Sequence, residues 1–162
     1  MFLLIYLVGV LTLLAASAYA QEFSRPASGT YIKDNWRSGS GVLNINNGQN
    51  LDAVAVLRYP NGQVYLATYI RSGESATLTG LQDGTYEVFF TIGKNWDSEA
   101  CKFAASQGFF KLNTDARFNT DWKDTGHYTI ATLQLKANPG MEGAVSSRLL
   151  TESEFPNLKS GI

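Results

Sequence analysis

The stretch LDAVAVLRYPNGQVYLATYI, residues 51–70, carries the strongest structural signal in this chain. Its two halves, 51–59 and 64–70, are rich in the β-branched and aromatic residues that favour strands. Pro60-Asn61-Gly62 separates them by the distance of a hairpin turn. Because side chains alternate along a strand, the second half should place three residues on one face: Tyr65, Ala67 and Tyr69. We therefore predict a β-hairpin here.

Similar segments precede and follow this hairpin in the sequence. The expected strands are 42–46, 76–81, 85–92, 108–112, 116–118, 127–137 and 143–150. Turns that contain Gly lie between several of them, at Asn47-Gly48, Gln82-Asp83-Gly84 and Asn138-Pro139-Gly140. Short strands at this spacing are typical of sandwiches and barrels. The sequence predicts an all-β fold: a single antiparallel β-sandwich over residues 41–157, immunoglobulin-like or transthyretin-like.

The two ends of the chain differ from this domain. Residues 1–20, MFLLIYLVGVLTLLAASAYA, have no charged side chain and end in an A-x-A site. This pattern predicts a hydrophobic signal helix that directs secretion, to the periplasm, the cell surface or the medium. The alternative is a retained single-pass membrane anchor, since the run is long enough to span a bilayer. Residues 21–40 are polar and aperiodic, which indicates a linker or an N-terminal arm, and 158–162 should form a C-terminal tail.

Composition limits the possible functions. Thirteen basic and fourteen acidic residues give a net charge of −1, without the basic patch that nucleic-acid binding requires. The chain has one histidine, His127, and one cysteine, Cys101, which cannot supply the ligands of a zinc site. It also lacks the G-x-S-x-G motif of many hydrolases. We predict no catalytic residue, no metal and no cofactor. The Cys101 thiol could be inert, form an intermolecular disulfide or be catalytic.

The three tryptophans are the candidate ligand-binding residues. Trp36, Trp96 and Trp122 all lie in polar, irregular segments, outside the expected strands. Exposed indole rings beside polar side chains can hold sugar rings by stacking. Alternatively, the same rings close the open ends of the sandwich.

Two resemblances extend this interpretation. Residues 78–88, LTGLQDGTYEV, resemble the G-L-x-x-G-x-Y-x-V hairpin of transthyretin-like and carboxypeptidase-regulatory-like domains. A longer series is similar to an uncharacterised family of bacterial exported β-sandwich domains: Asn47-Gly48, Asp52-Ala53-Val54, Gly73, Gly84-x-Tyr86, Gly93-x-x-Trp96, Tyr128-Thr129 and Glu154-Phe155-Pro156. This resemblance spans residues 41–157. It implies one exported β domain and carries over no functional residue.

These observations predict a non-enzymatic protein-interaction or structural module of the bacterial cell envelope or extracellular space. Its partner would be an envelope or extracellular protein, or a second copy of the chain. The alternative is a carbohydrate-binding module that binds a polysaccharide, and a third interpretation is an enzyme of unfamiliar type. Nucleic acid is not an expected partner, and a membrane is one only if residues 1–20 are retained.

Overall fold

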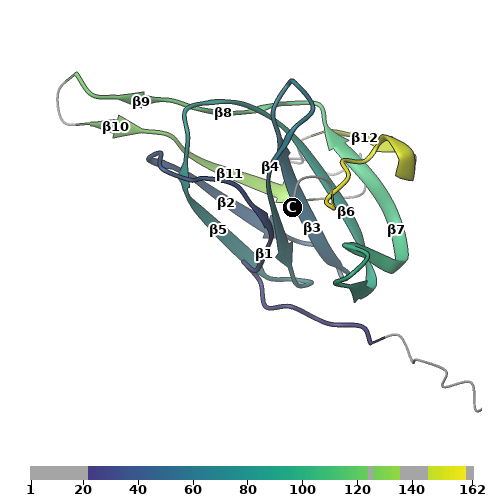
Figure 1. The fold of residues 1–162 in the computed structure, drawn as a ribbon. Helices are drawn as coiled ribbons and strands as arrows, with labels where there is room; N and C mark the ends of the chain where they lie inside the picture. The colour runs from purple at the N-terminus through teal and green to yellow at the C-terminus, as the bar shows by residue number, and fades with distance from the viewer. Residues whose placement is uncertain (1–21, 124–125, 136–145, 160–162) are drawn as a thin grey trace, which may run out of the picture.

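The computed structural model describes residues 22–123, 126–135 and 146–159. In this part of the chain a large and a small sheet pack as a sandwich (Figure 1), and two further short strands form a separate hairpin. This arrangement confirms the predicted all-β sandwich. The strands are β1 (Tyr31–Asp34), β2 (Gly41–Asn47), β3 (Asp52–Arg58), β4 (Val64–Ile70), β5 (Ser75–Leu81), β6 (Gly84–Asp97), β7 (Lys102–Leu112), β8 (Ala116–Phe118), β9 (Thr120–Asp121), β10 (His127–Tyr128), β11 (Ile130–Leu135) and β12 (Ser147–Leu150). A short 3-10 helix, η1 (Glu152–Glu154), follows β12.

The large sheet has the order β1-β4-β3-β6-β7-β12, with β8 paired to β6, and all of these pairs are antiparallel. The small sheet has the order β11-β2-β5. Here β2 is antiparallel to β5 but parallel to β11, with Ile130 opposite Val42 and Leu135 opposite Asn47. Parallel neighbours need a long crossover. The crossover in this protein is most of the large sheet, which lies between the two strands in the sequence.

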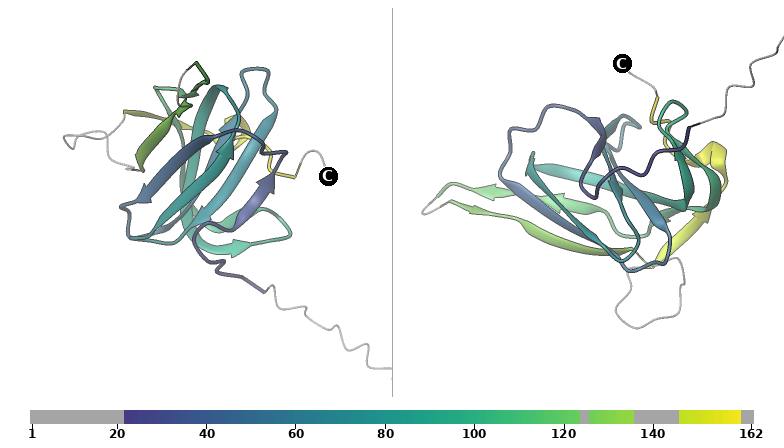
Figure 2. Two further views of the ribbon diagram at one scale, coloured as in Figure 1. Left: turned by 90° about the vertical axis from the view of Figure 1, so that its left-hand side faces the viewer. Right: turned by 90° about the horizontal axis from the view of Figure 1, so that it is seen from below.

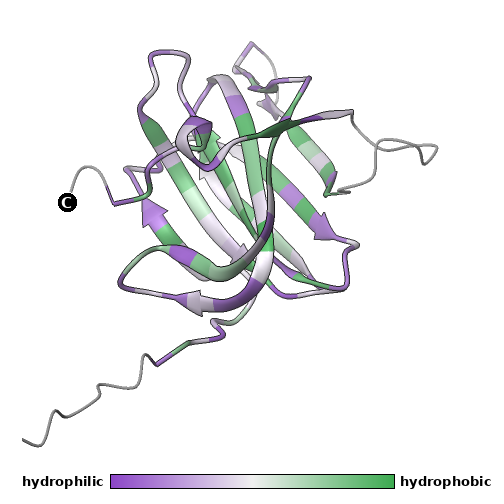
Figure 3. Cartoon of the chain, turned by 90° about the vertical axis from the view of Figure 1, so that its right-hand side faces the viewer, coloured by the Kyte–Doolittle hydropathy of each residue, from purple (hydrophilic) through white to green (hydrophobic). Residues whose placement is uncertain are grey.

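Apolar layers cover both faces of the centre of the large sheet. Between the sheets, Leu43 and Ile45 of β2 belong to one cluster with Phe90 of β6. On the opposite face, Val54 and Val56 belong to a second cluster, which the curled β6–β7 hairpin and the C-terminal segment complete. Burial on both faces explains why β3 and β4 are almost continuously apolar in sequence. Figure 3 shows hydrophobic residues along the strands and hydrophilic residues gathered at the turns.

A β-bulge changes the predicted alternation of β4. Arg58 pairs with Val64, and the next residue of β3, Leu57, pairs with Leu66, so Tyr65 is the extra residue between them. The expectation that Tyr65 shares a face with Ala67 and Tyr69 is therefore wrong. Tyr65 points into the core between the sheets, whereas the other two residues lie in the second apolar layer. A bulge shifts alternation by one residue, so each side chain beyond it changes face.

Both ends of the described chain lie on the sandwich. The segment 22–40, predicted as a linker or an arm, packs against the domain and contributes β1, which pairs with β4 at the edge of the large sheet. Leu158, the first residue of the predicted tail, is 7% exposed and belongs to the second apolar layer. The domain therefore extends beyond both of its predicted boundaries. The described residues contain no helix of the length and apolarity that crossing a membrane requires, and residues 1–20 lie outside them.

Candidate functional site

On the outer face of the small sheet, the side chains of β5 are exposed and those of the central strand β2 are half-buried. Alternation directs Leu43 and Ile45 of β2 into the core and the intervening side chains outward. The outward positions of the three strands are Val42, Asn44, Asn46, Ser75, Thr77, Thr79, Ile130, Thr132 and Gln134, which we call the open face. None of these residues is charged. Charged side chains normally make up roughly a quarter to a third of a protein surface, so this is a marked local departure.

The register of the strands places the polar side chains of the open face in two rows, and a hydrogen bond joins two members of each row. Thr132, Asn44 and Thr77 lie opposite one another across the three strands, and so do Gln134, Asn46 and Ser75. The Thr77 hydroxyl donates to Asn44 Oδ1 at 2.8 Å, and the Ser75 hydroxyl donates to Asn46 Oδ1 at 2.7 Å. Each bond uses one of the two lone pairs of an amide oxygen. The amide N–H groups remain as donors and the hydroxyl oxygens as acceptors.

Two exposed aromatic side chains lie on the hairpin that leads into the open face. The β9–β10 hairpin extends beyond one end of the sandwich (Figure 1), as the right-hand view of Figure 2 also shows. After β10 the chain continues into β11, an edge strand of the small sheet. On this path Tyr128 is 49% exposed and Ile130 61%, and Trp122, which follows β9 on the other arm of the hairpin, is 76% exposed. A Cβ placed on Gly126 would lie 3.7 Å from the Trp122 ring, so the indole lies close to the opposite arm of the hairpin.

The three tryptophans do not form one site. Trp36 is 80% exposed and lines a hollow of about 350 Å³ with Tyr59 and Gln63. The structure shows no contact between Trp36 and Trp122 among the described residues. Trp96 is only 1% exposed, so its prediction as a ligand-binding residue is wrong.

Trp96 is buried because β6 continues beyond its predicted end and then bends. The pairing of β6 with β7 shifts register between Ile92 and Gly93, and Asn95 has a positive φ of 59°. The bend turns the indole into the second apolar layer, where it meets the Tyr69 ring edge-on at 5.7 Å and the Phe103 ring at 5.1 Å. Gly93 allows this close packing, since a Cβ there would lie 2.6 Å from the Cβ of Phe103.

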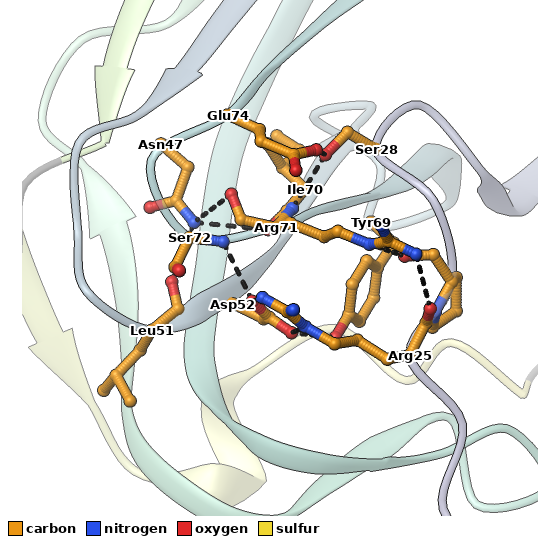
Figure 4. Close-up of polar contacts among 11 residues, drawn as sticks. Arg25, Ser28, Asn47, Leu51, Asp52, Tyr69, Ile70, Arg71, Ser72 and Glu74 are labelled. Carbon is orange, nitrogen blue, oxygen red and sulfur yellow. Dashed lines mark hydrogen bonds and ion pairs between the residues drawn. The ribbon is translucent and has the colours of Figure 1, made fainter.

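A buried carboxylate anchors the N-terminal segment to the sandwich (Figure 4). The Arg25 guanidinium donates two hydrogen bonds to Asp52, at 2.8 and 2.9 Å, and the Tyr69 hydroxyl donates a third at 2.6 Å. The Ser72 N–H donates a fourth. Burial opposes ionisation of Asp52, but these donors outweigh it and lower its pKa to about 2. Burial, together with the neighbouring carboxylate, raises the pKa of Tyr69.

We call the ion pair of Arg25 with Asp52, and the Tyr69 and Ser72 donors around it, the clamp. A hollow of about 360 Å³ lies beside it, lined also by Phe23, Lys94 and Asn95. The Asp52 carboxylate accepts four hydrogen bonds from the protein, which is about the number that a carboxylate can accept. Its role in the hollow is therefore to hold the structure together.

The remaining reactive side chains form no recognisable catalytic group. Cys101 is partly exposed in the β6–β7 turn, with a positive φ of 50°, and its Sγ lies 3.4 Å from the Ser98 carbonyl oxygen. His127 is exposed on β10. Across the described ranges, no three His, Cys, Asp or Glu side chains gather in a way that could hold a metal ion.

The polar residues of the open face are not among the functional residues predicted from the sequence. Their signal was present, because Asn44-x-Asn46 and Ser75-x-Thr77-x-Thr79 alternate with buried apolar residues. An ordinary solvent-facing strand surface would include charged residues, and their absence from these positions could have identified this surface. The parallel pairing of β11 with β2 adds Thr132 to the open face. This pairing has no comparable signal in the local sequence.

Comparisons with protein-family models, with curated proteins and with solved structures found no match for this chain.

Proposed function

We propose that this protein is an exported, non-enzymatic binding module and that it binds an envelope or extracellular component through the open face. The observation that supports this most directly is the exposure of a sheet face without charged side chains. The core between the sheets covers the inner face of the small sheet, and apolar layers cover both faces of the centre of the large sheet. Export rests on the leader pattern of residues 1–20.

The chemistry of the face favours binding over simple solvation. A charged side chain loses much hydration free energy when a partner covers it, whereas a hydroxyl or an amide can exchange its water for one ligand group. The centres of protein binding surfaces are correspondingly depleted in charge and enriched in Trp and Tyr. The open face has no charged residue, and the hairpin that continues into it carries the exposed Trp122 and Tyr128.

The test is co-sedimentation with the insoluble envelope and with the extracellular material of the protein's own cells. The double variant Thr77→Lys, Thr132→Lys places a charge on each side of Asn44. We expect its bound fraction to fall about tenfold or more, because covering two unpaired charges should cost well over the 1.4 kcal/mol that corresponds to a factor of ten.

The matched control is Gln107→Lys, which adds a charge at an exposed position of β7 in the large sheet. This variant should bind like the unmodified protein. Equal binding by all three proteins, or binding by none, would contradict the proposed function.

A further inference from the structure

The open face offers only a small contact area to a ligand. Three strands spaced about 4.8 Å apart, with about five residues rising 3.3 Å each, cover roughly 250 Å². A stable protein–protein interface needs about 800 Å² on each partner. The open face alone is therefore too small for a stable protein interface, but it suits a narrow ligand.

The charge pattern restricts the ligand further. None of the open-face residues offers a cation to an anionic polymer, and binding of such polymers depends on neutralising their charge. The face instead presents alternating donors and acceptors in the rows of Asn44 and Asn46, fixed by hydrogen bonds from Thr77 and Ser75. Dense, uncharged donors and acceptors complement hydroxyl groups, because every neutral hydroxyl can both donate and accept.

The exposed rings at one end of the face add a second mode of contact. Trp122 and Tyr128 offer apolar ring faces beside a polar surface. This combination suits a ligand with hydroxyl groups on its edges and C–H groups on its faces. Sugar rings have this construction, whereas a peptide chain presents amides in one plane with varied side chains.

We propose that the open face binds an uncharged polysaccharide chain, an inference that rests on the proposed function. Trp122 and Tyr128 stack on its sugar rings, and Asn44, Thr77 and Thr132 hydrogen-bond its hydroxyl groups. The chain runs along β11 from the β9–β10 hairpin onto the small sheet.

The ligand class can be tested without knowing the polymer. Envelope and extracellular material that binds the protein is divided into portions treated with periodate, which cleaves vicinal diols of sugars, or with a broad-specificity protease. Periodate should reduce binding about tenfold, and protease should leave it unchanged. If protease abolishes binding and periodate does not, the partner is a protein: this inference then fails, while the proposed function stands.

Residue variants locate the contact. In native gels cast with neutral polysaccharides such as mannan, dextran and galactan, at least one should retard the protein, and the polyuronate alginate should not. Trp122→Ala should lose about tenfold in apparent affinity. Trp36→Ala removes an equally exposed ring that lines a separate hollow with Tyr59 and Gln63, so its retardation should be unchanged. Retardation by alginate alone, or a loss confined to the Trp36 variant, would overturn the inference.

Discussion

Trp96 is the most consequential single residue of the second apolar layer. It is 1% exposed and contacts two aromatic rings, yet its Nε1 has no hydrogen-bond partner among the described residues. An unpaired buried donor costs stability. The large ring and the polar atom therefore have opposite effects on stability at this position.

Substitution should separate these two effects. We expect Trp96→Ala to lower the free energy of unfolding by about 3–5 kcal/mol, the usual cost of removing a buried aromatic ring. Trp96→Phe keeps most of the packing and removes the unpaired N–H, so its cost should be about 1–2 kcal/mol. Urea denaturation of both variants measures the difference. Similar costs for the two variants would mean that the indole N–H has a hydrogen-bond partner in solution.

At the scale of elements, the clamp joins the N-terminal segment to β3 and β4. The lowered pKa of Asp52, about 2 compared with the ordinary 3.8, means that the folded state binds its proton more weakly than the unfolded chain does. The stabilisation is therefore complete above about pH 5 and is lost as the pH falls through 3.8 towards 2. The shift corresponds to at most about 2.5 kcal/mol, and solvent around the exposed Arg25 reduces this value.

Asp52→Asn tests this pH dependence. The variant cannot titrate, so its free energy of unfolding should fall less steeply between pH 5 and pH 2 than that of the unmodified protein. Some slope should remain because hydrogen bonds from Lys111 and Arg58, which outweigh burial, lower the pKa of Glu87. Urea denaturation at several pH values gives both curves. Parallel curves would show that Asp52 titrates normally in the folded protein.

An element can be predicted from the sequence when its own residues determine it, and not when pairing with a distant strand does. The β3–β4 hairpin follows from its own composition and turn, so the two strands were predicted within one or two residues. The bulge at Tyr65 was not predicted, because it depends on the register with β3. β1 was also missed, since its four residues form a strand through pairing with β4 more than through their own pattern.

The same reasoning applies to the candidate site. Exposure of Trp36 and Trp122 agrees with their polar sequence surroundings. Trp96 has similar neighbours in sequence, but the bend after Ile92 buries it. Local polarity therefore indicates which residues are near the surface, whereas the curvature of a strand determines which of them enter a core.

At the scale of the whole molecule, the unequal exposure of the tryptophans predicts its fluorescence. Iodide should quench the emission of Trp36 and Trp122, which are 80% and 76% exposed, and leave that of Trp96 nearly unaffected. The double variant Trp36→Phe, Trp122→Phe should therefore emit at shorter wavelength and resist iodide. Trp96→Phe is the matched control and should be quenched almost completely. Resistance to iodide in that control would show that a second copy, or another part of the chain, covers the exposed rings.

The parallel pairing of β2 with β11 has a consequence for biosynthesis. The small sheet joins strands from opposite ends of the domain, so β2 and β5 leave the ribosome well before their third partner. About 50 residues separate the end of β5 from the start of β11, which at 5–20 residues per second is a delay of roughly 3–10 s. During that delay one side of β2 has no partner strand. A chain in this state can accept the β11 of a neighbouring molecule, so a high local concentration of incompletely folded chains would favour domain-swapped dimers.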